Sequence, residues 1–128
     1  MAVTSQTLEQ GQRNVVMHFT NNGDAEAAVL KVDVSAMSPA CDRVAIEKIK
    51  FNTNNTGGTT ATGVNILWDA TTPVLAATLP PNSVGELDFR DIGGLQDPKA
   101  TGWTGDIKFT CSADDAYAIT LVMKKKNA

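Results

Sequence analysis

The chain has 128 residues, a length that fits a single domain. Hydrophobic residues make up 42% of it, which is enough for a packed core and too many for a disordered protein. The formal net charge of −3 argues against general nucleic-acid binding, because such binding needs a concentrated basic surface. No run of about 18 apolar residues is present, so we expect no membrane-spanning helix.

The N-terminal residues 1–12 are polar and follow neither a strand nor a helix period. We therefore expect an extended arm here, followed by one β-sandwich domain over residues 13–128. The N-terminus lacks a charged start followed by an apolar segment, so it does not resemble a secretory signal. We expect synthesis in the cytoplasm.

Two strands are predicted in the first third of the chain. Residues 13–20 form an apolar segment that ends at the turn sequence Asn-Asn-Gly-Asp. Residues 27–37 alternate between apolar and polar side chains, which is typical of a half-buried strand. The polar face of this strand would carry Lys31. The apolar face would carry Leu30, Val32 and Val34.

Residues 42–53 are compatible with either a helix or a strand. A strand requires a bulge near Glu47–Lys48, because the apolar side chains change face there. The β-rich neighbouring segments favour the bulged strand. Residues 52–63, rich in Asn, Thr and Gly, follow as a polar loop that we expect to be mobile.

The second half of the chain has the more regular pattern. Five short segments of apolar alternation are separated by turn sequences, one of them the pair Pro80-Pro81, which fixes a corner. The predicted strands lie at 64–70, 73–79, 86–91, 106–112 and 117–124. About eight strands at this spacing predict an all-β fold, an antiparallel β-sandwich of the jelly-roll type.

Few residues carry recognisable chemistry. His18 is the only histidine and lies inside a predicted strand, so we expect a packed or surface side chain rather than a catalytic one. Glu86 and Asp88 share one strand face, which is typical of a solvent-facing acidic pair. Cys41 and Cys111 are too few for a disulfide framework and are expected to be separate thiols. No cofactor or metal motif is present.

The aromatic residues allow two interpretations. Trp68 and Tyr117 fall on apolar strand faces, which favours core packing over a carbohydrate-stacking platform. Trp103 lies in a loop, where an interface anchor, local loop packing and ligand binding all remain open. The lysines 124–126 are interpreted as a solvated end that keeps the last strand soluble.

Residues 64–126 resemble small virion structural proteins of tailed bacteriophages. The resemblance is carried by "NILWDATTPVLAATLPPNSVGELDFRDIGGL" and "GWTGDIKFTCSADDAYAITLVMKKK". Its specific elements are "LDFRD", "GGL", "TGDI-F-T" and a final "Y-ITL" strand that ends in lysines. The chain looks like the jelly-roll head decoration, or cement, proteins that bind outside a capsid. No motif in this resemblance is catalytic.

This resemblance implies a non-enzymatic protein of the virion that binds the outer capsid surface and bridges major capsid protein subunits. It implies a homo-oligomer, a dimer or trimer, on the capsid. The polar arm would add a strand to a neighbouring subunit. Another phage β-protein of the neck, tail or fibre, or a carbohydrate-binding module, is the alternative. The expected interface residues are Thr4, Gln6, Leu8, Gln10, Arg13 and Trp103.

Overall fold

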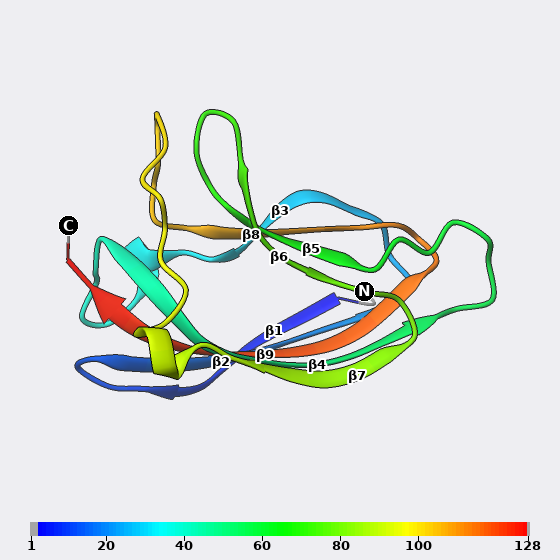
Figure 1. Cartoon of the computed structure of the whole chain (residues 1–128), viewed down its shortest axis with the longest axis horizontal. Coiled ribbons are helices and arrows are strands. Elements are labelled where there is room, and N and C mark those ends of the chain that lie inside the picture. The colour runs from blue at the N-terminus through cyan, green and yellow to red at the C-terminus, as the bar shows by residue number, and fades with distance from the viewer. Residues whose placement is uncertain (1–2, 128) are drawn as a thin grey trace.

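The structure is a computed structural model that describes residues 3–127. Within these residues nine β-strands form two antiparallel sheets that lie face to face (Figure 1). The strands are β1 (Val3–Gln10), β2 (Asn14–Asn22), β3 (Glu26–Val32), β4 (Arg43–Asn55), β5 (Val64–Trp68), β6 (Val74–Leu79), β7 (Ser83–Asp88), β8 (Ile107–Cys111) and β9 (Asp115–Lys126). Two short 3-10 helices are η1 (Val34–Ala36) and η2 (Arg90–Ile92).

The strand pairing is that of one long nested hairpin. β5 pairs with β6, β4 with β7, β3 with β8 and β2 with β9, all antiparallel. Two further pairings, β4 with β9 and β5 with β8, wind this hairpin into two sheets. The sheet orders are β1-β2-β9-β4-β7 and β3-β8-β5-β6. Eight strands arranged in this way form a jelly roll, so the predicted antiparallel β-sandwich is confirmed.

The core lies between the two sheets and follows the predicted alternation. Along β9 every second side chain is buried, beginning at Asp115 and ending at Lys125. Phe109 of β8 stands at its centre, 5.2 Å from the ring of Phe19 and 5.8 Å from the ring of Tyr117, in edge-to-face geometry. These contacts join the two sheets. The faces predicted for the strands at 64–70, 106–112 and 117–124 are therefore correct.

The ambiguous segment at 42–53 is the bulged strand. β4 pairs with β9 along its whole length, and the register shifts between Ile46 and Lys48. This shift turns both Ile46 and Ile49 into the core, where neither is exposed. The bulge thus resolves the change of face that the sequence contains.

The predicted orientation of β3 is wrong for Leu30 and Lys31, whereas Val32 and Val34 are buried as predicted. Lys31 is buried and Leu30 is exposed, the reverse of what regular alternation gives. The pairing of β3 with β8 is interrupted twice, once between Glu26 and Val29 and once between Leu30 and Val32. Because an irregularity changes the face of the residues that follow it, Lys31 and Val32 both point inward.

The predicted N-terminal arm is also wrong in part, since Val3–Gln10 form a strand of the domain's own sheet. β1 pairs antiparallel with β2, so its backbone has a partner within the chain. Every residue of β1 after Val3 is exposed on whichever face it lies. A strand with no buried face shows no apolar period, which is why its sequence resembles an arm.

The loop at 52–63 is shorter and better held than predicted. Its first four residues belong to β4, which ends at Asn55. The Asp114 carboxylate accepts hydrogen bonds from the backbone and hydroxyl of Thr60. The Asp115 carboxylate accepts hydrogen bonds from the backbone N–H groups of Thr62 (3.2 Å) and Gly63 (2.9 Å). Two neighbouring carboxylates thus anchor the loop to the start of β9.

We predict that the Asp115 carboxylate makes stability acid-sensitive. Burial raises its pKa, but hydrogen bonds from the Ser112, Gly63 and Thr62 backbone outweigh burial and hold the pKa below its ordinary value. A lowered pKa in the folded state stabilises the protein above about pH 4, and this stabilisation is lost as the pH falls. Asp115→Asn should cost about 1–3 kcal/mol at neutral pH.

Urea unfolding of the wild type and of Asp115→Asn at neutral and acidic pH tests this. The difference in the free energy of unfolding between the two proteins should narrow as the pH drops below about 4. An equal difference in the free energy of unfolding at both pH values would show that the charge of Asp115 contributes nothing to stability.

Candidate protein-interaction surface

Strand β1 forms an open edge of the five-stranded sheet. Thr4 and Gln6 lie opposite Thr20 and His18 of β2, and all four side chains point away from the core. The hydroxyl groups of Thr4 and Thr20 hydrogen-bond to each other. The other edge of β1 has no neighbouring strand within residues 3–127. A partner strand could pair there through main-chain hydrogen bonds.

A bulge in β1 gives this edge an apolar side chain. The register shifts between Thr7 and Glu9, which leaves Leu8 as the unpaired residue, 52% exposed. Gln10 lies beyond the bulge, and its Oε1 accepts a hydrogen bond from the backbone N–H of Ser38 (2.7 Å). Gln10 is thus engaged within the domain, while Leu8 is available to a partner.

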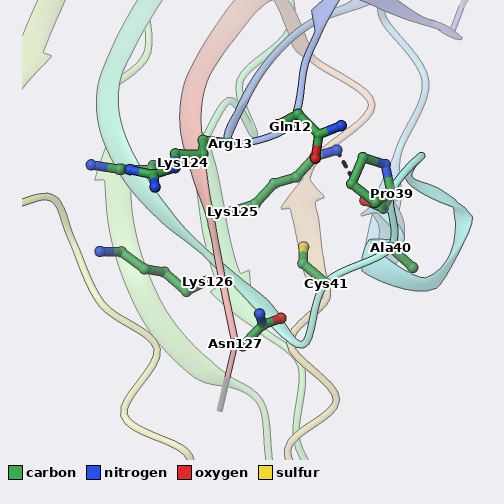
Figure 2. A pocket seen from close by; sticks show the side chains of 9 residues that line it. All are labelled: Gln12, Arg13, Pro39, Ala40, Cys41, Lys124, Lys125, Lys126 and Asn127. Atoms are coloured by element: carbon green, nitrogen blue, oxygen red, sulfur yellow. Dashed lines mark hydrogen bonds between the residues drawn. The ribbon is translucent and has the colours of Figure 1, made fainter.

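A basic hollow lies where β1 turns into β2 and where β9 ends. It has a volume of about 510 Å³. Its lining includes Gln12, Arg13, Pro39, Ala40, Cys41, Lys124, Lys125, Lys126 and Asn127 (Figure 2). Figure 2 shows Lys124 and Lys126 on one side of β9 and Lys125 on the other. The concentration of positive charge suits an acidic partner surface.

The three terminal lysines are not equivalent, which corrects the expectation of one solvated end. Lys125 is buried, and its Nζ donates a hydrogen bond to the Pro39 carbonyl oxygen (2.9 Å). Lys125 N–H also donates to the Arg13 carbonyl oxygen (2.5 Å). Lys125 therefore holds the end of β9 against the 38–41 segment, whereas Lys124 and Lys126 keep their charges at the surface.

Trp103 is separated from the other expected interface residues. It lies in the 96–106 loop, where its backbone N–H donates to the Ala100 carbonyl oxygen. Its ring is half-buried, with Lys99 Nζ 5.6 Å from the ring centre. Of the interpretations left open, local loop packing describes this position best. Thr4, Gln6, Leu8, Gln10 and Arg13 do come together along β1 and its turn.

The residues considered for catalysis have structural partners. His18 Nδ1 hydrogen-bonds to Thr120 Oγ1 (2.7 Å). Glu86 forms an ion pair with Lys48 (3.3 Å), and Arg90 forms one with Asp88 (2.8 Å). The hydrogen bonds from Arg90 lower the pKa of Asp88 to about 2. An acid that stays ionised is unsuited to donate a proton near neutral pH.

The buried aromatic residues do not form a carbohydrate platform. Trp68 is 2% exposed and Tyr117 is 4% exposed, so their predicted packing in the core is confirmed. Within residues 3–127, no group of three or more His, Cys, Asp or Glu side chains is placed to hold a metal ion. The same residues contain no helix with the length and apolar character needed to span a bilayer.

We predict that the two free thiols react slowly and to different degrees. Burial raises the pKa of Cys41, against the opposing effects of the Lys126 backbone and Lys125 charge. Burial and the charges of Glu26 and Asp115 raise the pKa of Cys111 to about 12. Because the thiolate is the reactive form, a thiol reagent at about pH 8 should label Cys41 slowly and Cys111 hardly at all before unfolding. Native labelling of Cys111 at the rate of Cys41 would contradict this, with Cys41→Ser and Cys111→Ser separating the two signals.

No protein-family model matches the chain, and no curated protein sequence matches it. Among solved structures, the chain is similar to an RmlC-like cupin protein from Desulfovibrio desulfuricans, with 5% identity and a TM-score of 0.37 over 94% of this chain and 80% of that one. It is also similar to a cupin superfamily protein from Desulfitobacterium hafniense DCB-2, with 12% identity and a TM-score of 0.38 over 97% of this chain and 78% of that one. Likenesses of this size carry no argument about activity or partner.

Proposed function

We propose that the protein is a non-enzymatic structural protein of a tailed-phage virion, a head decoration protein that binds the outer capsid surface through strand β1. The observation that supports this most directly is β1 itself. The domain keeps an eight-residue strand of which every side chain after Val3 is exposed. Such a strand adds little to the core of one chain, and it offers both a free edge and an exposed leucine to a partner.

The rest of the molecule suits this function. Its closed core gives a rigid platform, and two pairs of its surface charges are held in local ion pairs. A protein that binds only the assembled shell stabilises that shell by mass action. In this proposal the copies form a dimer or trimer around a capsid symmetry axis, and each bridges major capsid protein subunits. The resemblance of residues 64–126 to phage virion proteins supports the same context.

We predict that deleting residues 1–12 abolishes particle binding and leaves the domain folded. β2 would become the edge strand, and its inward side chains, Val15 and Phe19, would remain packed in the core. Circular dichroism checks the fold, and co-sedimentation with particles lacking the protein checks binding. Unchanged co-sedimentation of the folded deletion variant would refute a role for β1.

A matched pair of leucine substitutions sharpens the test. Leu8 of β1 and Leu75 of β6 are exposed to similar degrees, 52% and 55%, on edge strands of different sheets. Leu8→Asp should weaken particle binding about tenfold or more, because a charge replaces an apolar contact at the interface. Leu75→Asp adds the same charge and should bind as the wild type does. Equal losses for both variants would point to net charge rather than to β1.

Cryo-electron microscopy of the virion distinguishes the head from other locations. Density for this fold at many icosahedral positions, with β1 against the major capsid protein, is the expected result. Density confined to the neck or tail would replace the decoration function with the alternative virion role. Absence of the protein from purified particles would refute both.

A further inference from the structure

A cluster of polar side chains is buried between the two sheets, and no function considered so far uses it. Asn21 ends the inward face of β2, while Glu26 and Lys31 lie on β3 of the opposite sheet. These three residues are 3%, 5% and 7% exposed, respectively. Burial of an amine, a carboxylate and a carboxamide in one small core is costly, so their mutual arrangement calls for an explanation.

The Glu26 carboxylate holds the other two groups together. Its Oε2 forms an ion pair with Lys31 Nζ. Its Oε1 accepts hydrogen bonds from Asn21 Nδ2 (3.1 Å) and from the Tyr117 hydroxyl (2.5 Å). One carboxylate therefore contacts both an amine nucleophile and the nitrogen of an amide. That is the position of a general base and acid between an attacking and a leaving group.

The Asn21 carboxamide is held as an electrophile would be. Its Oδ1 accepts hydrogen bonds from the backbone N–H groups of Gly23 (2.9 Å) and Asp24 (2.8 Å). Two backbone donors on one carbonyl oxygen polarise the carbonyl and stabilise negative charge that develops on that oxygen during attack. Asn21 Nδ2 also donates to the Asp24 carbonyl oxygen (2.8 Å), which fixes the plane of the amide.

The surroundings exclude water from this cluster. The Phe109 ring lies 5.8 Å from Lys31 Nζ, and Phe19 and Tyr117 pack against that ring. Burial first, and then the hydrogen bond to Glu26, raise the pKa of Tyr117, so its hydroxyl remains a donor that orients the carboxylate. A dry, fixed site favours attack by the amine over attack by water.

We propose that Lys31 and Asn21 condense into an intramolecular amide cross-link, with Glu26 as the catalytic residue that moves the protons. Glu26 takes a proton from Lys31, and the free amine attacks Asn21 Cγ, forming the Nζ–Cγ bond. The Cγ–Nδ2 bond then breaks. The two protons lost by Lys31 pass through Glu26 to Nδ2, which leaves as ammonium, and Glu26 ends ionised as it began. No oxidant or cofactor takes part.

The cross-link would join β2 of one sheet to β3 of the other. Its closed loop contains the Asn22–Glu26 turn and most of β3, the segment in which the strand pairing is interrupted twice. Because these irregularities interrupt the main-chain pairing, a covalent connection here would hold this part of the four-stranded sheet against the core.

Intact-mass spectrometry of the purified full-length chain under denaturing conditions tests the proposal. The wild type should be lighter than its sequence by one ammonia molecule, and a lysine-specific protease should fail to cut after Lys31. Fragmentation of the single peptide that contains both residues should place an internal cross-link between residues 21 and 31. Folded wild-type protein that keeps its full sequence mass after prolonged incubation would overturn the proposal, and so would the loss of water instead of ammonia.

Three variants identify the chemistry. Lys31→Met and Glu26→Gln should both keep the full mass of their sequences, whereas Lys108→Met should still lose ammonia, because Lys108 pairs with Asp69 outside this cluster (3.0 Å). The Lys31→Met variant also controls for Asn22, which precedes Gly23 and would lose ammonia on forming a succinimide. Loss of ammonia that persists in Lys31→Met would therefore overturn the cross-link. Where Lys31→Met fails to fold, resistance of the wild type to cleavage after Lys31 still separates the cross-link from a succinimide at Asn22.

Discussion

The alternation of inward and outward side chains along β9 is the constraint on which the two-sheet arrangement depends. β9 pairs with β2 on one side and with β4 on the other, so it fixes the registers of both. Its buried side chains, from Tyr117 to Met123, lie in the core together with the buried side chains of β5 and β8. A shift of one residue in β9 would turn this whole set toward solvent, and no compensating shift in β2 alone would restore the core.

The same strand also separates the charges of the molecule. It starts at Asp115, beside Asp114, and ends at Lys124–Lys126. Nine to eleven residue steps of extended chain place these groups about 30–36 Å apart. The acidic end uses its carboxylates to anchor the 56–63 loop, whereas two of the terminal lysines keep their charges outward. Although the net charge is −3, one end of the molecule is basic. That end lies beside the turn from β1 into β2.

The sequence predicted the parts of the fold in which one face of a strand is buried. β5, β8 and β9 each bury alternate residues, and their periods were visible without the structure. The bulge of β4 was also predictable, because apolar residues demanded a change of face there. β1 was not, since an edge strand with no buried face has no alternation of apolar and polar side chains. As a result, the residues of β1 were correctly expected to lie outside the core but were assigned to an extended arm.

The cluster around Glu26 lay beyond sequence reasoning for a different reason. Lys31 and Glu26 have the residue types of a solvent-facing strand side, and regular alternation sends Lys31 outward. The two interruptions of β3 turn Lys31 inward. The partners of Glu26 come from three other strands, which the fold brings beside it: Asn21 of β2, Cys111 of β8 and Tyr117 of β9. No local pattern encodes that convergence.

A buried ion pair of this kind seldom repays its desolvation, and an apolar replacement of similar volume is often as stable. If stability alone had shaped the site, an apolar pair would have served, and the two backbone N–H groups on Asn21 Oδ1 would have found another acceptor. The contacts suit the proposed reaction, because Glu26 touches the Lys31 amine and two backbone N–H groups polarise the Asn21 carbonyl. A covalent strap inside the sandwich would also free its outer edges, β1 above all, to act in binding without any share in holding the domain together.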